Sequence, residues 1–206
     1  MMQNVLLGSI LALAPSAPAA AADPLAEALA ASYAAEAGRD LQAAALPLKE
    51  AIASRRDNYL LNLRLGWLSY RLGLWNESTR YYQEAARIEH QAIEPLQGLL
   101  LPLAAAGKTQ ETMETHARIL AVDPNNYKSL SQLAWQNYLQ KNYKDSADLY
   151  LRAVRLYPTD VEMLVGLASS LQLGGNKPYA DTFYRKVLLI SPTDRRALEG
   201  LKRGKI

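Results

Sequence analysis

The chain has 206 residues, half of them apolar, and its formal net charge is +3. The apolar content argues against a disordered protein, and the small net charge argues against one whose main task is to neutralise nucleic-acid phosphates. Cysteine is absent, which excludes disulfides, thiolate metal sites and a lipid anchor on cysteine but does not choose a compartment.

The first 22 residues differ in composition from the rest of the chain. They carry no charged side chain, and an apolar run from Val5 to Ala14 precedes two prolines and an alanine tract. This pattern predicts a secretory signal peptide over residues 1–22, cleaved before Asp23. The apolar run is too short to span a bilayer as a helix. Because no Lys or Arg lies near Met1, an alanine-rich leader on a cytoplasmic protein stays open as the alternative.

Three prolines recur at a spacing of 34 residues: Pro124, Pro158 and Pro192. A period of this length is typical of a chain built from stacked two-helix units. Taken as blocks of 34 residues, the chain divides into 25–58, 59–92, 93–126, 127–160 and 161–194. Residues 195–206 begin a further first helix, in which Leu198 and Leu201 are expected to pack on the last block as a cap.

Each block has the pattern of two helices joined by a turn. Block position 20 is always small, which allows the two helices to approach closely: Ala44, Ser78, Thr112, Ser146 and Ala180. Position 24 is mostly large, and is predicted to fill the wedge between successive blocks: Leu48, Tyr82, His116, Tyr150 and Tyr184. The turn near position 15 has glycines suited to a left-handed backbone: Gly38, Gly73, Gly107 and Gly175. Lys141 stands there in block four.

Two stretches carry a family resemblance, NLRLGWLSYRLGLWNESTRYYQEAARI from Asn62 and AVDPNNYKSLSQLAWQNYLQKNYKDSADLYLRAVRLYP from Ala121. They resemble tetratricopeptide repeats, and the resemblance extends over blocks 25–194. It implies an all-α, right-handed superhelical solenoid of about five helix-turn-helix repeats with a capping helix, over residues 23–206. Two prolines depart from the pattern: Pro47 is expected to interrupt the second helix of block one, and Pro102 is expected to lie inside the first helix of block three.

The resemblance also implies a binding surface, because first helices of such repeats line the concave side. The residues that it points to in blocks two and four are the predicted partner-binding set: Arg64, Trp67, Tyr70, Arg71, Gln132, Trp135 and Tyr138. Tyr, Trp and Arg are the side chains that most often dominate binding energy. Packing of these rings on neighbouring helices, without any ligand, is the alternative. The Lys and Asn clamp of chaperone-tail receptors is missing, since Leu29 and Leu63 occupy its positions.

The sequence offers little for catalysis. His116 occupies a core position, and His90 lies at a block boundary beside Glu89. No nucleophile context, phosphate-binding loop or dinucleotide fingerprint is present. We therefore expect a non-enzyme with no cofactor and no metal.

The predicted function is a protein-interaction scaffold that holds a partner polypeptide in its concave groove. The leader places it in a cell-envelope assembly of bacterial type, in the periplasm. Self-assembly into a homo-oligomer is one alternative. Docking to a membrane surface is another, through the basic C-terminus with its Arg195, Arg196, Lys202, Arg203 and Lys205. Nucleic acid is not expected as a partner, because no known recognition motif accompanies these charges.

Overall fold

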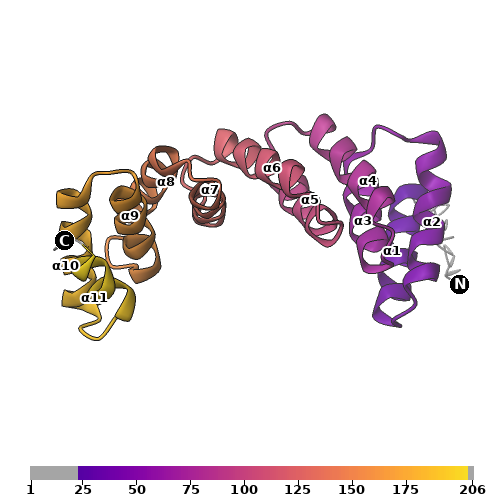
Figure 1. The fold of residues 1–206 in the computed structure, drawn as a ribbon. Helices are drawn as coiled ribbons and strands as arrows, with labels where there is room; N and C mark the ends of the chain where they lie inside the picture. Colours follow the sequence, from indigo (N-terminus) through magenta and orange to yellow (C-terminus); the bar gives the residue numbers. More distant parts are fainter. Residues whose placement is uncertain (1–22, 204–206) are drawn as a thin grey trace, which may run out of the picture.

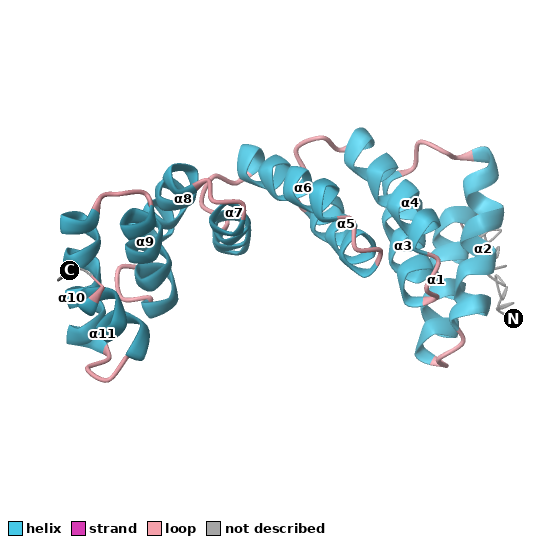
Figure 2. Cartoon of the chain, in the orientation of Figure 1, coloured by secondary structure: helices cyan, strands magenta, loops and turns pink. Residues whose placement is uncertain are grey.

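The computed structural model describes residues 23–203, and every regular element in this range is an α-helix (Figure 2). The helices are α1 (Pro24–Ala37), α2 (Leu41–Ser54), α3 (Tyr59–Arg71), α4 (Trp75–Ile88), α5 (Glu94–Ala105), α6 (Thr109–Val122), α7 (Tyr127–Leu139), α8 (Tyr143–Leu156), α9 (Val161–Leu173), α10 (Lys177–Ile190) and α11 (Arg195–Lys202). The segment predicted to be a signal peptide lies outside the described residues.

The helices pack in chain order along an elongated arch (Figure 1). Each helix contacts its neighbours in the sequence, and the two members of each pair, such as α3 and α4, pack closely. The expected all-α solenoid of sequential helix pairs is confirmed. None of the helices in residues 23–203 combines the length and the apolar character needed to cross a membrane.

The first helices begin at a recurrent polar cap. The side chains of Asn58, Asn126, Asp160 and Asp194 each accept a hydrogen bond from a backbone N–H of the helix that follows, at 3.0 or 3.1 Å. Each such cap contributes about 0.5–2 kcal/mol. The exception is α5, where Ile93 stands at the cap and has no side-chain acceptor.

Small residues bring the two helices of a pair together, as predicted. Ser78 of α4 donates its hydroxyl to the carbonyl oxygen of Gly66 on α3 at 2.7 Å. Ser146 of α8 makes the same bond to Ala134 of α7 at 2.8 Å. A larger side chain at either serine would separate the backbones and break this bond.

The turns follow the predicted backbone in three repeats and depart from it in one. Gly73, Gly107 and Gly175 have positive φ. In the first repeat Gly38 is right-handed, with a φ of −73°, and the left-handed residue is Arg39, with a φ of 64°. Gly38 stands one place before the turn position in the sequence, and the left-handed residue lies at that position, Arg39, because the block period and not the nearest glycine fixes the turn.

Pro47 does not interrupt its helix, which corrects a second expectation, and Pro102 lies inside a helix as expected. Pro47 lies inside α2 and Pro102 inside α5. A proline in a helix costs about 3 kcal/mol, but Leu48 and Leu103 beside these prolines are almost completely buried. Burial of one such side chain offsets about 1.5–3 kcal/mol, so packing on adjacent helices keeps both helices continuous.

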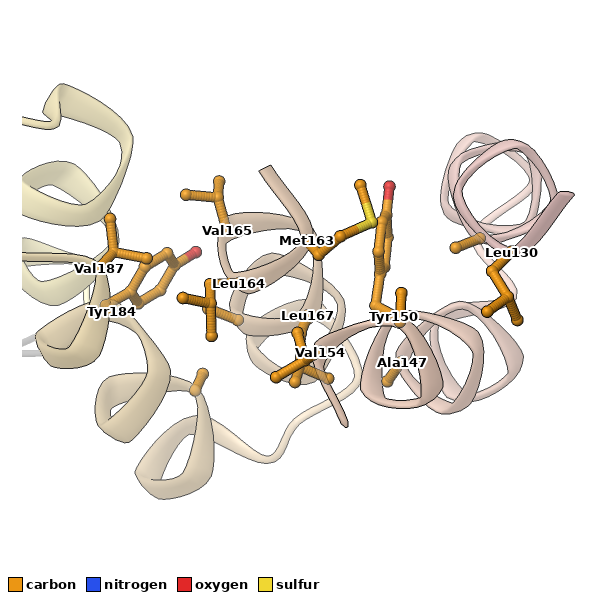
Figure 3. Packing of buried hydrophobic residues seen from close by; sticks show 14 of the residues in the cluster. Leu130, Ala147, Tyr150, Val154, Met163, Leu164, Val165, Leu167, Tyr184 and Val187 are labelled. Carbon is orange, nitrogen blue, oxygen red and sulfur yellow. The ribbon is translucent and has the colours of Figure 1, made fainter. Parts of the chain in front are cut away.

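The apolar core is one large cluster in the C-terminal half and several smaller ones in the N-terminal half. The large cluster runs from Leu120 to Ala197, and Figure 3 shows the rings of Tyr150 and Tyr184 within it. All five residues at the predicted wedge position are buried. The cap α11 packs on this cluster through Ala197 and Leu201, whereas Leu198 is 40% exposed, contrary to the expectation that it would pack there.

Candidate functional site

A pocket of about 430 Å³ lies between the first helices of the first three repeats, α1, α3 and α5. Its apolar lining consists of Leu29, Leu60, Leu63, Leu101, Tyr33, Trp67 and Tyr82. Arg64, Glu94 and Gln97 add polar groups. Such a volume and such a lining are typical of a cavity that receives an apolar group and orients it with a few polar contacts.

The carboxylate of Glu36, on α1, holds the wall of this pocket in place. It accepts a hydrogen bond from Trp67 Nε1 at 2.9 Å and pairs with the guanidinium of Arg64. Arg64 in turn lies over the ring of Tyr33, with its Cζ atom 3.8 Å from the ring centroid. Trp67 and Arg64 are therefore fixed before any partner arrives, which lowers the entropy that binding must overcome.

The pKa of Glu36 lies below the usual value for a glutamate. The hydrogen bond from Trp67 is the main cause, and the charge of Arg64 adds to it, while burial acts in the opposite direction. Glu36 is accordingly ionised at neutral pH, and the charge-assisted bonds that fix the pocket wall are present.

Glu94, at the start of α5, brings a carboxylate to the rim. It accepts a hydrogen bond from the hydroxyl of Tyr59 at 3.1 Å. Burial and this bond to Glu94 raise the pKa of Tyr59 to about 12, so the phenol stays protonated and continues to donate. The rim thus presents negative charge beside an apolar floor.

Tyr70 and Arg71 lie next to this pocket without lining it. The ring of Tyr70 is 6.1 Å from that of Trp67, centroid to centroid. The guanidinium of Arg71 lies over the Trp67 ring at 5.3 Å and 3.8 Å from a carboxylate oxygen of Glu36. Both residues pack against Trp67 without lining the pocket, so packing accounts for their contacts.

The second predicted aromatic pair lies in the C-terminal half and outside this pocket. Trp135 is 47% exposed, and its ring stacks on that of Tyr138 with centroids 5.5 Å apart. Tyr143 of α8 meets Tyr138 edge to face at 5.8 Å. The stacked pair is an exposed apolar surface available for contact.

Gln132 does not belong with either aromatic pair. It lines a smaller cavity of about 160 Å³ between α6 and α7, together with His116 and Gln136. The seven predicted residues therefore occupy three places: Arg64 and Trp67 in the pocket wall with Tyr70 and Arg71 behind it, Trp135 and Tyr138 on the other half, and Gln132 between the halves.

The prediction missed Glu36, although it organises the pocket. Its block position holds tyrosine in the second and fourth repeats, at Tyr70 and Tyr138, so a carboxylate there is out of pattern. That break in the pattern was the available signal.

The titratable groups of the described residues form no obvious reaction centre. No group of three or more His, Cys, Asp or Glu that could hold a metal ion occurs in residues 23–203. His116 is buried, its Nδ1 lies 3.0 Å from the Ser129 hydroxyl, and burial lowers its pKa. The site offers apolar contact and hydrogen bonds, the means of binding a polypeptide.

Comparison with known proteins identifies the fold. No family model matches the chain, and none of the curated proteins gives a significant match. Among solved structures, the MamA protein matches with a TM-score of 0.65 and 13% identity over 82% of this chain and 92% of its own. A tetratricopeptide repeat protein from Parabacteroides merdae matches with a TM-score of 0.65 and 20% identity, over 86% of this chain and 70% of its own.

A third structure, YrrB, is described as a tetratricopeptide repeat protein with an unusual peptide-binding site. It matches with a TM-score of 0.62 and 12% identity over 83% of this chain and 88% of its own. At such identities the likeness concerns the fold alone. The chain has the fold of a tetratricopeptide repeat solenoid.

Proposed function

We propose that this protein is a non-enzymatic scaffold that binds a partner polypeptide by taking one of its apolar side chains into the pocket between α1, α3 and α5. The observation that carries the proposal is the pocket itself, whose leucines lie open while Glu36 holds its wall rigid. Leu60 is 52% exposed and adjoins the other apolar side chains of the pocket, so it adds to a continuous apolar surface. The described peptide site of YrrB, on the same fold, supports a polypeptide as the occupant.

The rim chemistry favours a partner that is positively charged beside its apolar residue. Glu94 supplies a carboxylate, whereas the cation of the pocket, Arg64, is already paired with Glu36. Gln97 adds an amide that can bond a partner backbone. A segment with Leu or Phe flanked by Lys or Arg would satisfy both features.

Photocrosslinking in cells tests this proposal. A photoreactive amino acid replacing Leu63 in the pocket should crosslink to a discrete partner, identified by mass spectrometry. The additional substitution Leu60→Asp should abolish the adduct, because it places a charge in the apolar floor. Leu46→Asp is the matched control, since Leu46 is 60% exposed on α2 and does not line the pocket. Adducts that survive Leu60→Asp would refute the pocket as the docking site.

The location of this scaffold is part of the proposal. The apolar, uncharged leader supports export to the periplasm and a role in a cell-envelope assembly. N-terminal sequencing of the protein from fractionated cells tests it: a mature chain beginning at Asp23 in the periplasmic fraction is expected. An intact Met1 in the cytoplasmic fraction would contradict export while leaving the binding proposal untouched.

One observation favours self-association as a second function. The last full repeat exposes Leu189 together with Tyr179 and Ile190, which are 49% and 41% exposed on α10. Light scattering over a range of concentrations tests this, with Leu189→Asp expected to abolish any association. The basic C-terminus is less free than its composition indicates, because Arg196 pairs with Glu162 and Asp194.

A further inference from the structure

Three junctions between repeats are closed by the same pair of residues. A tyrosine of the second helix packs on a glycine 16 residues later, in the first helix of the next repeat: Tyr82–Gly98, Tyr150–Gly166 and Tyr184–Gly200. A Cβ atom at any of these glycines would overlap the tyrosine ring. The missing side chain therefore lets the ring lie directly on the helix backbone.

Two junctions lack this tyrosine–glycine pair. The equivalent residues are Leu48 and Arg64 between the first and second repeats, and His116 and Gln132 between the third and fourth. The approach of the first helices on either side of each junction differs in the same way. The backbones of α3 and α5, of α7 and α9, and of α9 and α11 approach each other closely, whereas those of α1 and α3 and of α5 and α7 do so at most marginally. Closure of a junction therefore follows the tyrosine–glycine pair.

Polar bridges close the first of these two junctions. Arg64 and Trp67 of α3 both bind Glu36 of α1, and Lys49 of α2 pairs with Glu77 of α4 at 3.0 Å. The side chain of Arg64, at the position of the glycine, is only 10% exposed and lies against Tyr33 and Glu36 of α1. This junction is rigid by a different means.

The junction between α6 and α7 is bridged by hydrogen bonds without an ion pair: His116 meets Ser129, Gln140 donates to the Met113 sulfur, and Arg152 of α8 donates to the carbonyl oxygen of Pro124 in the turn. Within residues 23–203, no ion pair joins the part before Asp123 to the part after Asn126. Tyr59 and Tyr127 bridge neighbouring first helices by hydrogen bonds to Glu94 and Asp160, but the equivalent residue of the third repeat is Ile93, which has no hydroxyl.

The contacts that join α6 to α7 lie mostly near the connecting turn. Leu120 joins the C-terminal core cluster, and His116 Nδ1 meets the Ser129 hydroxyl at 3.0 Å. Farther from the turn a cavity of about 160 Å³ separates α6 from α7, and Met113 of α6, which packs on the C-terminal cluster, accepts a hydrogen bond from Gln140 Nε2 at 3.5 Å. The helices are thus joined at one end and open at the other.

We propose that the solenoid bends at this junction, with residues 24–122 and 127–203 moving as two rigid bodies about the turn at Asp123–Asn126. In Figure 1 the joint lies where α6 leads into α7. The pocket containing Trp67 is in one body and the exposed pair of Trp135 and Tyr138 is in the other. The joint angle sets the distance between these surfaces, so a partner that contacts both would fix the angle.

The absence of cysteine makes a direct measurement simple, because introduced cysteines are the only sites for spin labels. One labelled pair, Arg118→Cys on α6 and Arg155→Cys on α8, spans the joint alone and lies at exposed positions. A second pair, Lys144→Cys on α8 and Arg185→Cys on α10, spans the tyrosine–glycine junction of Tyr150 and Gly166. Pulsed dipolar spectroscopy should give a broad distance distribution for the first pair and a narrow one for the second.

Exchanging the junction residues makes the test causal. His116→Tyr with Gln132→Gly installs the missing pair, and should narrow the first distribution at least twofold. The reciprocal exchange, Tyr150→His with Gly166→Gln, should broaden the second. Circular dichroism checks that each variant is helical. If a variant is not, the test is the comparison of the two distance distributions in the unexchanged protein. A first distribution as narrow as the second in that protein would overturn the proposal, as would a folded His116→Tyr/Gln132→Gly variant with unchanged width.

Discussion

The ring of Tyr150, on α8, packs on the backbone of Gly166, on α9. Helix α9 is the first helix of the next repeat. Replacing Gly166 by alanine adds one methyl group to a space that the ring already fills. We expect the free energy of unfolding to fall by about 1–3 kcal/mol, the usual effect of overpacking. This runs against intrinsic helix propensity, which favours alanine over glycine by about 1 kcal/mol. Urea denaturation followed by circular dichroism measures it.

The Tyr150→Ala background separates overpacking from other effects. With the ring removed, Gly166→Ala should become neutral or stabilising, because only helix propensity remains. An equal loss of stability in both backgrounds would show that the ring and the glycine are not coupled.

Acid should weaken the protein through His116. Burial lowers the pKa of this imidazole in the folded state, and the positive charge of Lys128 lowers it further. Lys108, which lines the same cavity, is also cationic but pairs with Glu111. Because the folded state prefers the neutral ring, its contribution to stability is complete above the unfolded pKa of about 6.5 and is lost as the pH falls below that value. Unfolding free energies measured from about pH 7.5 down to about pH 5 should show this decline.

His116→Gln removes the titrating group while retaining a polar side chain. We expect it to flatten the dependence on pH, whereas His90→Gln serves as the control for the only other histidine. A decline that persists unchanged in His116→Gln would assign it to another group.

The fold could be predicted from the sequence because it is periodic. Pro124, Pro158 and Pro192 locate the repeat, and the small and large residues of each block identify the two helices and the wedge between blocks. The errors arose where a single residue competes with its surroundings. Pro47 was expected to interrupt its helix, but its local preference is weaker than the packing of the adjacent buried Leu48.

The candidate site could be predicted only in part, for a related reason. First-helix positions that repeat, such as those of Leu63 and Trp67, do line the pocket. Glu36 occurs once, so no period reveals it, and its importance depends on Arg64 and Trp67 arriving from another helix. Gln132 was predicted to belong to the groove with Trp135, yet it lines the cavity toward the preceding repeat. Their spacing of three residues, which puts both on one side of a helix, did not reveal this difference.

Neutralising Glu36 should loosen the pocket wall. Glu36→Gln retains an acceptor for Trp67 but removes the charge that pairs with Arg64, whose side chain is largely buried. We expect a loss of about 1–2 kcal/mol at neutral pH, as for other hydrogen bonds to charged groups. The variant should also differ less from the parent protein in acid, because the lowered pKa of Glu36 contributes stability only above its folded-state pKa.

Glu84→Gln is the matched control for Glu36→Gln. Glu84 also pairs with an arginine, Arg87, at 2.7 Å, but this pair lies on the exposed surface. Its loss should have a much smaller effect on unfolding. Equal effects of the two substitutions would show that the network around Glu36 is no stronger than a surface pair.

A glycine at Lys141 should stabilise the fourth repeat. Lys141 has a φ of 64°, in the left-handed region, where the equivalent residues Gly73, Gly107 and Gly175 have no side chain. A residue with a Cβ atom costs roughly 1–2 kcal/mol in this conformation, and the greater freedom of glycine in the unfolded chain cancels about 0.5–1 kcal/mol of that gain. Lys141→Gly should therefore raise the melting temperature by about 2–4 °C in differential scanning calorimetry. Gly73→Ala, the reverse change in the second repeat, should lower it, and a shift of the same sign in both variants would show that backbone strain is not the cause.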